Sequence, residues 1–155
     1  YHEAFHAFLQ NFLFSPEQVK SVPLWLNEGL AQFFENSFMQ GDVLLIGQMD
    51  PKRVSLLKKY IQEEKTVPLS KFLEAGSPEF LVKSMKDVEN SNIHYLQAWG
   101  IVFYLATHYD LSRGNFFADY VTGLWRGQSP VAAFEKLTQK NIEEFDGLWK
   151  KAVRH

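Results

Sequence analysis

The residues with the clearest chemical potential lie at the start of the sequence. His2 and His6 stand four positions apart, and Glu3 directly follows the first histidine. Residues four apart project from the same face of a helix, so both imidazoles can reach one metal ion. A carboxylate at the position of Glu3 can then reach a water molecule at that metal. The alternative is an exposed helix that carries two histidines without binding a metal.

A catalytic zinc site needs a third protein ligand and an open position for water. The candidate third ligand is Glu28, which follows His6 by 22 residues. That interval is long enough for a loop to return and lay a second helix across the first. The small residues Gly29 and Ala31 beside it permit a close approach of two helices. The alternative is that Glu28 is a solvated helix residue. We expect His2, His6 and Glu28 to bind one zinc ion.

A zinc hydrolase also needs a general base and a donor that stabilises negative charge on the attacked carbonyl oxygen. Glu3 is the candidate base, and the alternative is an acidic residue that favours the helix dipole. Tyr95 and His94 are the candidate donors, at the start of a strongly apolar segment. The alternative for Tyr95 is a tyrosine at the edge of the core. Asn27 and Glu35 are candidates to orient the ligand histidines by hydrogen bonds.

Two parts of the sequence resemble the gluzincin metallopeptidases. The first is His-Glu-Ala-Phe-His at 2–6, followed by Trp-Leu-Asn-Glu-Gly-Leu-Ala at 25–31. The second motif is typically Trp-Leu-Asn-Glu-Gly-Phe-Ala in the aminopeptidase-N-like branch. The segment 95–105 is similar to the helix that carries the catalytic tyrosine of that branch. The resemblance implies a peptide or protein substrate, zinc on His2, His6 and Glu28, Glu3 as the base, and Tyr95 as the transition-state donor.

The resemblance covers residues 1–35 and 94–105 and has definite departures. The Gly-Ala-Met-Glu-Asn motif of the aminopeptidases does not occur, and the interval from His6 to Glu28 is slightly longer than in that branch. A hairpin after the glutamate helix is similar to the compact peptidase-MA-like domains of bacterial proteins. Because the aminopeptidase motif does not occur, the cleavage specificity stays open. The similarity to bacterial domains leads us to expect an extracytoplasmic location in a bacterium.

Composition restricts the class of protein. The chain has 155 residues, of which 46% are hydrophobic and 22% charged, and its formal net charge is −2. These values are ordinary for a globular domain, and no basic stripe points to nucleic acid as a partner. No apolar run approaches the ~18 residues of a membrane span. The absence of cysteine excludes disulfides and thiolate ligands. The sequence leaves the oligomeric state open.

Apolar periodicity predicts one mainly α-helical domain over residues 1–155. A helix is expected to be under way already at residue 2, and together with the resemblance this implies the later part of a larger metallopeptidase domain. Helix start signals and apolar stripes predict longer helices at 1–13, 24–35, 50–64, 94–108, 112–124, 129–137 and 141–153. A short β-hairpin is expected at 36–47, turning at Gly41-Asp42. The polar segment 83–92 is expected to form a loop. With the resemblance added, the expected fold is a helical zincin-like catalytic subdomain with one short β-hairpin.

The leading hypothesis is a zinc-dependent metallopeptidase that hydrolyses peptide bonds through a metal-activated water. The alternative is a catalytically inactive peptidase-like domain that serves as a binding or scaffold module. His108 and His155 are expected at the surface rather than among the ligands.

Overall fold

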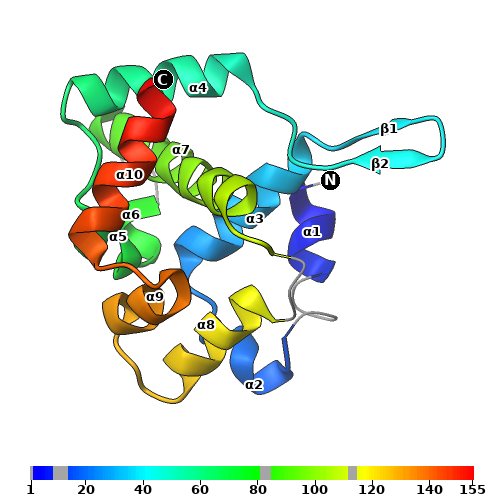
Figure 1. Ribbon diagram of the computed structural model, residues 1–155, viewed down its shortest axis with the longest axis vertical. Coiled ribbons are helices and arrows are strands. Elements are labelled where there is room, and N and C mark those ends of the chain that lie inside the picture. Colours follow the sequence, from blue (N-terminus) through cyan, green and yellow to red (C-terminus); the bar gives the residue numbers. More distant parts are fainter. Residues whose placement is uncertain (1, 9–13, 81–84, 112–114) are drawn as a thin grey trace.

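The computed structural model describes residues 2–8, 14–80, 85–111 and 115–155. Within these ranges the chain forms a mainly helical body with one antiparallel hairpin, as predicted (Figure 1). The helices in order are α1 (His2–Phe8), α2 (Pro16–Val19), α3 (Leu24–Glu35), α4 (Pro51–Gln62), α5 (Leu69–Leu73), α6 (Ser77–Phe80), α7 (Met85–His108), α8 (Phe116–Trp125), α9 (Pro130–Thr138) and α10 (Ile142–Arg154). The strands are β1 (Phe38–Gln40) and β2 (Val43–Leu45).

Several helices begin where a short polar side chain caps the free backbone N–H groups of the first turn. The Asp50 carboxylate accepts hydrogen bonds from the N–H groups of Lys52 and Arg53 before α4. The Ser129 hydroxyl and the Asn141 side chain cap α9 and α10 in the same way. Such caps stabilise a helix by about 1 kcal/mol and act within a few residues. They explain why these helix starts were predictable from the sequence.

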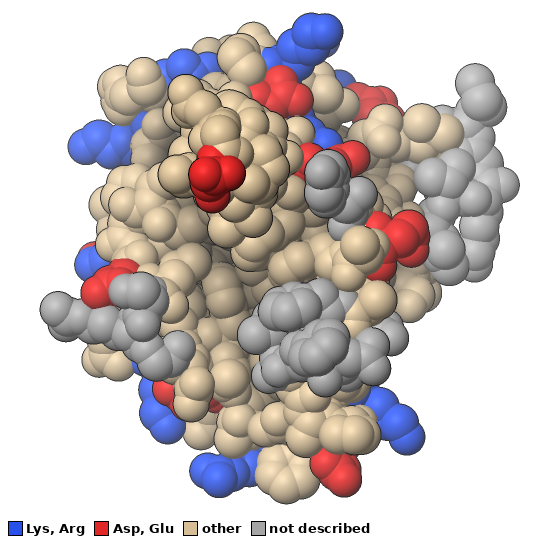
Figure 2. Space-filling view, turned by 90° about the vertical axis from the view of Figure 1, so that its right-hand side faces the viewer, with Lys and Arg blue, Asp and Glu red and all other residues tan. Residues whose placement is uncertain are grey.

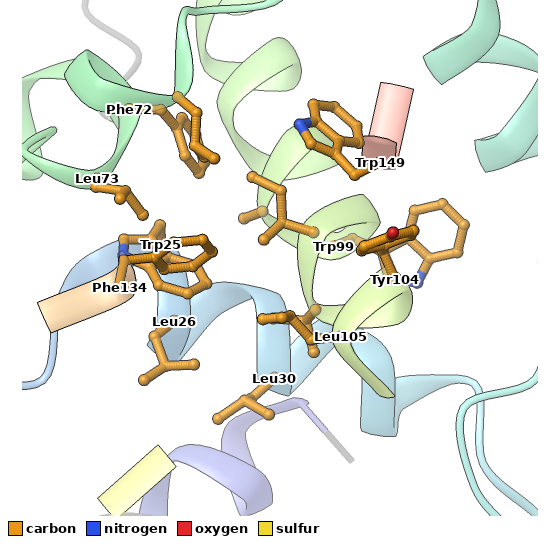
Figure 3. Close-up of a cluster of buried hydrophobic side chains, with 14 of the residues drawn as sticks. Trp25, Leu26, Leu30, Phe72, Leu73, Trp99, Tyr104, Leu105, Phe134 and Trp149 are labelled. Atoms are coloured by element: carbon orange, nitrogen blue, oxygen red, sulfur yellow. The ribbon is translucent and has the colours of Figure 1, made fainter. Parts of the chain in front are cut away.

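The core is organised around α3 and α7, which pack against each other along their length. Apolar side chains from these two helices meet others from α5, α9 and α10 in one continuous cluster (Figure 3). Trp25 of α3 is fully buried, and its indole lies within 7 Å of the rings of Phe72, Tyr120 and Phe134. The core therefore fixes α3, the helix that carries Glu28, from several directions.

Helix α1 lies against the other end of α3. The rings of Phe5 and Phe34 stack with centroids 4.3 Å apart and planes 17° from parallel. Burial of two aromatic rings in a stacked pair stabilises the contact beyond the area alone. This contact sets the position of the histidine-bearing helix relative to the glutamate-bearing helix.

The hairpin projects from the body at the end of α3 (Figure 1). Its register pairs Phe38 with Leu45 and Gln40 with Val43. Phe38, Met39, Val43 and Leu44 are all at least half exposed. Uncharged side chains cover most of the face from which the hairpin projects, and Lys and Arg lie mainly at its margins (Figure 2).

One predicted element is wrong. The segment 83–92 was expected to be a loop, but α7 begins at Met85, so its described part is helical. The polar residues Glu89, Asn90 and Asn92 face solvent, while Ser91 and Ile93 are buried. The Ser91 hydroxyl donates to the carbonyl oxygen of Phe80, which ties this first part of α7 to α6. Packing against α6 therefore stabilises helix in a stretch that carries little apolar periodicity of its own.

The remaining boundaries differ by a few residues. Helix α8 begins at Phe116 rather than at 112, and residues 112–114 lie outside the described part of the chain. The predicted extension of the first helix to residue 13 also falls on residues that are not described. None of the described helices is both long and apolar enough to cross a membrane.

Candidate metal centre

Helices α1 and α3 bring His2, His6 and Glu28 together. The Nε2 atoms of His2 and His6 are 3.1 Å apart. His2 Nε2 lies 3.4 Å from Glu28 Oε2, and His6 Nε2 lies 3.6 Å from Glu28 Oε1. Among the described residues these three side chains form the one group of His, Asp and Glu with the spacing of a metal site. The predicted ligand set therefore converges in space.

These separations fit a tetrahedral metal ion. Ligand atoms about 2.0–2.1 Å from a zinc ion at tetrahedral angles lie about 3.3 Å from one another. The three observed separations of 3.1, 3.4 and 3.6 Å bracket that value. Two imidazole nitrogens and one carboxylate also form a donor set that suits zinc. The residues present thus fit the ion that the sequence implied.

The hydrogen bond between His6 and Asn27 prepares the His6 ring for a metal. His6 Nδ1 lies 3.0 Å from Asn27 Oδ1. With the amide oxygen in this position Nδ1 carries the hydrogen and donates it, so in the neutral ring the lone pair is on Nε2. That nitrogen is the one that faces His2 and Glu28. Asn27 therefore sets the tautomer that a metal ligand requires.

The site opens toward solvent on one side. The side chain of His2 is 30% exposed, that of His6 17% and that of Glu28 13%. A fully enclosed cluster would leave no position for water or substrate, whereas these values leave access on the His2 side. Glu3, the next residue on α1, is exposed. If these side chains held a metal ion, this access would leave a position open for water, as in catalytic rather than closed structural sites.

Tyr95 of α7 lies beside Glu28. Burial raises the pKa of the Tyr95 hydroxyl, and the negative charge of Glu28 raises it further. The structure therefore places Tyr95 near enough to Glu28 for the charge of that carboxylate to act on its hydroxyl. A tyrosine hydroxyl is already protonated at neutral pH, so the raised pKa keeps it a hydrogen-bond donor to still higher pH.

His94 and Glu35, the other two candidate residues, make their contacts away from His2, His6 and Glu28. The ring of His94 is buried, stacks on Phe72, and has Nδ1 2.8 Å from the carbonyl oxygen of Asn90. Glu35 is paired with Arg53 at 3.0 Å. The structure therefore brings Tyr95 rather than His94 to the ligands, and Asn27 rather than Glu35 to a ligand histidine. His108 and His155 are exposed, as predicted.

A buried glutamine, which the sequence did not single out, connects the parts of the site. The Gln32 amide donates to the carbonyl oxygen of Tyr95 at 3.0 Å and to that of Glu28 at 3.4 Å. It thereby links α3 and α7 at the residues proposed for catalysis. One feature of the sequence could have identified Gln32. It follows Glu28 by one helical turn and lies on the same side of the helix as Glu35.

Comparison with known proteins gives one family. A family model described as "Protein of unknown function (DUF1570)" matches residues 1–123. The matched region includes the two ligand-bearing helices and Tyr95, and the chain belongs to this family. Neither the curated proteins nor the solved structures give a match.

Proposed function

We propose that this member of the DUF1570 family is a zinc-dependent metallopeptidase. The observation that carries the proposal is the convergence of two imidazole nitrogens and one carboxylate at tetrahedral spacing. The Asn27 contact, which leaves the neutral His6 with its lone pair on Nε2, supports the same conclusion. Peptide bonds are the proposed substrate because the sequence motifs resemble those of the gluzincin peptidases.

His2, His6 and Glu28 would hold the ion. A divalent cation with one carboxylate and two neutral imidazoles retains a single positive charge. Bound there, zinc would supply Lewis acidity toward a carbonyl oxygen and lower the pKa of water.

Glu3 supplies the base in this mechanism. It adjoins His2, a proposed ligand, on α1, and its side chain is exposed. Its carboxylate accepts a proton from the attacking water and delivers it to the nitrogen of the leaving amine. This transfer balances the hydrolysis: a C–O bond forms, the C–N bond breaks, and the amine leaves neutral.

Tyr95 supplies the hydrogen-bond donor. A tyrosine hydroxyl is protonated at neutral pH, and burial together with the Glu28 carboxylate raises the pKa of Tyr95 further. A neutral donor fixed beside the ligands stabilises negative charge that develops on the attacked carbonyl oxygen. Gln32 holds the backbone of Tyr95 in place through the bond to its carbonyl oxygen.

The test separates metal binding from hydrolysis. Purified protein is equilibrated with zinc, its metal content is measured, and cleavage of a quenched fluorescent peptide library is followed. Glu3→Gln is expected to keep one bound zinc and to lose hydrolysis by about 10²–10⁴-fold. Tyr95→Phe is expected to keep the zinc and to lose about 10²–10³-fold in kcat. Glu17→Gln, at an exposed glutamate in the first turn of α2, is the matched control and should change neither property.

Two outcomes contradict the proposal. Full hydrolysis by Glu3→Gln would remove the base from the mechanism. Zinc bound by the unaltered protein without cleavage of any peptide would instead support the inactive, binding-module alternative.

A further inference from the structure

A second concave site lies between α4, α7 and the last turn of α10. This groove has a volume of about 440 Å³. The volume falls within the range of about 300–1,000 Å³ that small-molecule sites occupy. None of the proposed metal ligands lines it, so it is separate from the candidate metal centre.

The floor of the groove is apolar. Leu57 of α4 and Trp99 and Gly100 of α7 line it and are buried in the body of the protein. Half-buried Phe103 and Val153 form part of its walls. Covering such a surface with apolar groups of a ligand removes it from water, which is favourable by roughly 25 cal/mol per Å².

The charges at the groove have one sign. None of the described residues that line it is acidic, whereas Lys58, His108 and His155 are basic. Lys59, the neighbour of Lys58 on α4, pairs with Glu63 at 3.9 Å. Within the described part of the chain, no carboxylate pairs with Lys58 in the same way. The groove therefore offers an uncompensated cation to an anionic ligand.

The His108 ring is held with one nitrogen available. It stacks on Tyr104 with centroids 4.0 Å apart, and its Nδ1 lies 3.1 Å from the Tyr104 carbonyl oxygen. A carbonyl oxygen only accepts, so Nδ1 carries the hydrogen. The Thr107 hydroxyl, 2.9 Å from the same nitrogen, already lies within bonding distance of the Phe103 and Tyr104 carbonyl oxygens. Nε2 is thus the ring atom left for a ligand, and in this neutral tautomer it accepts a hydrogen bond.

We propose that the groove binds a small amphipathic carboxylate of the medium-chain fatty acid type. Its acyl chain lies on the apolar floor over Leu57 and Trp99, and its carboxylate pairs with the Lys58 ammonium at the edge of the groove. A peptide is a poorer occupant, because the backbone groups of α4 and α7 along the floor, at Leu57, Trp99 and Gly100, are engaged in helical hydrogen bonds. An extended backbone laid there would lose its bonds to water without replacement. The proposal does not depend on the peptidase function.

The experiment is calorimetric titration of the purified protein with decanoate, and with decanol as the uncharged analogue. Decanoate is expected to bind one per chain and more tightly than decanol. Lys58→Ala should weaken decanoate binding about twofold to fivefold, the effect of losing one partly exposed ion pair. Lys59→Ala, at the neighbouring lysine outside the groove, should leave it unchanged. Ala152→Trp, at an exposed residue of the lining, should fill the groove and abolish binding while zinc binding persists.

Three results would overturn the proposal. The first is no binding of decanoate, and the second is equal binding by the unaltered protein and Ala152→Trp. The third is self-association of the unaltered protein that Ala152→Trp abolishes in sedimentation, because that would assign the groove to a second copy of the chain. Circular dichroism of each variant shows that a lost signal does not reflect unfolding.

Discussion

At the residue scale, the contact between Asn27 and His6 supports the metal site that we propose, because it orients the ring of a proposed ligand. Asn27 precedes the ligand Glu28 in α3, so one helical turn supplies both a ligand and the group that orients another ligand. Hydrogen bonds of this kind raise the basicity of the ligating nitrogen and fix the ring. The two functions of this turn are coupled because any shift of α3 moves both side chains together.

Removal of the Asn27 side chain should weaken zinc binding without removing a ligand. Asn27→Ala is expected to lower zinc affinity about 10–100-fold, since His6 loses the acceptor that holds its ring. Asn27→Asp keeps an acceptor oxygen and should retain most of the affinity. Competition with a chromogenic chelator measures both. Asn92→Ala, on an exposed position of α7, is the control. Equal affinity for Asn27→Ala and the control would show that the contact does not tune the site.

At the scale of elements, the close packing of α3 against α7 positions Glu28 relative to Tyr95. Gly29 makes this approach possible, because a Cβ at that position would lie 2.7 Å from the Ala98 carbonyl oxygen and 2.7 Å from Val102 Cγ2. The Ala98 atom belongs to the backbone, so it cannot move aside as a side-chain end can. Gly29 stands next to the ligand, and the two helices meet where the site is built.

Gly29→Ala should therefore destabilise the fold. The inserted methyl group must push α3 and α7 apart, at a cost of about 1–3 kcal/mol in the free energy of unfolding. Gly147→Ala is the matched comparison, because nothing lies within 4 Å of a Cβ on that residue of α10. There the same change should stabilise the helix by about 0.5–1 kcal/mol. Urea denaturation of the two variants gives the comparison, and equal effects of the same sign would refute the role assigned to Gly29.

At the scale of the whole molecule, a single apolar core joins α3, α7, α8, α9 and α10 and contains several tyrosines. Tyr120 is buried against Trp25, and burial raises the pKa of its hydroxyl well above the ordinary value of 10.0. The nearby Trp25 indole lowers that pKa by a smaller amount. Burial likewise raises the pKa of Tyr104 and Tyr109. The folded state thus holds these protons more tightly than the unfolded chain does.

The stability of the protein should fall at alkaline pH for this reason. A tyrosine whose pKa is higher in the folded state than in the unfolded chain stabilises the folded state. This stabilisation is fully present below the unfolded pKa of about 10 and is lost as the pH rises through the folded pKa. In that pH range each such tyrosine lowers the free energy of unfolding by up to about 1.4 kcal/mol per pH unit. Tyr120→Phe should make the fall shallower, and chemical denaturation between about pH 8 and about pH 11 measures the slope. Parallel slopes for the two proteins would show that Tyr120 does not control alkaline stability.

The features that the sequence determined by itself are those decided within one or two helical turns. Asp50, Ser129 and Asn141 cap the residues that directly follow them, so their helices begin where the sequence predicts. The spacing of His2 and His6 likewise places both rings on one face of α1, because a helix repeats every 3.6 residues. The motif around Glu28 and the apolar stripe of α3 identified the second helix with the bounds that the structure has.

Only the tertiary structure decided the rest, because it depends on contacts between residues far apart in the chain. The choice of Tyr95 over His94 follows from which side of α7 faces Glu28, and Gln32 sets that orientation across 63 positions. Glu35 turns to Arg53 of α4 and leaves Asn27 as the partner of His6. Helix α7 starts at Met85 because α6 packs on it. Helical periodicity specifies the face on which a side chain lies, but packing selects the neighbour that this face meets.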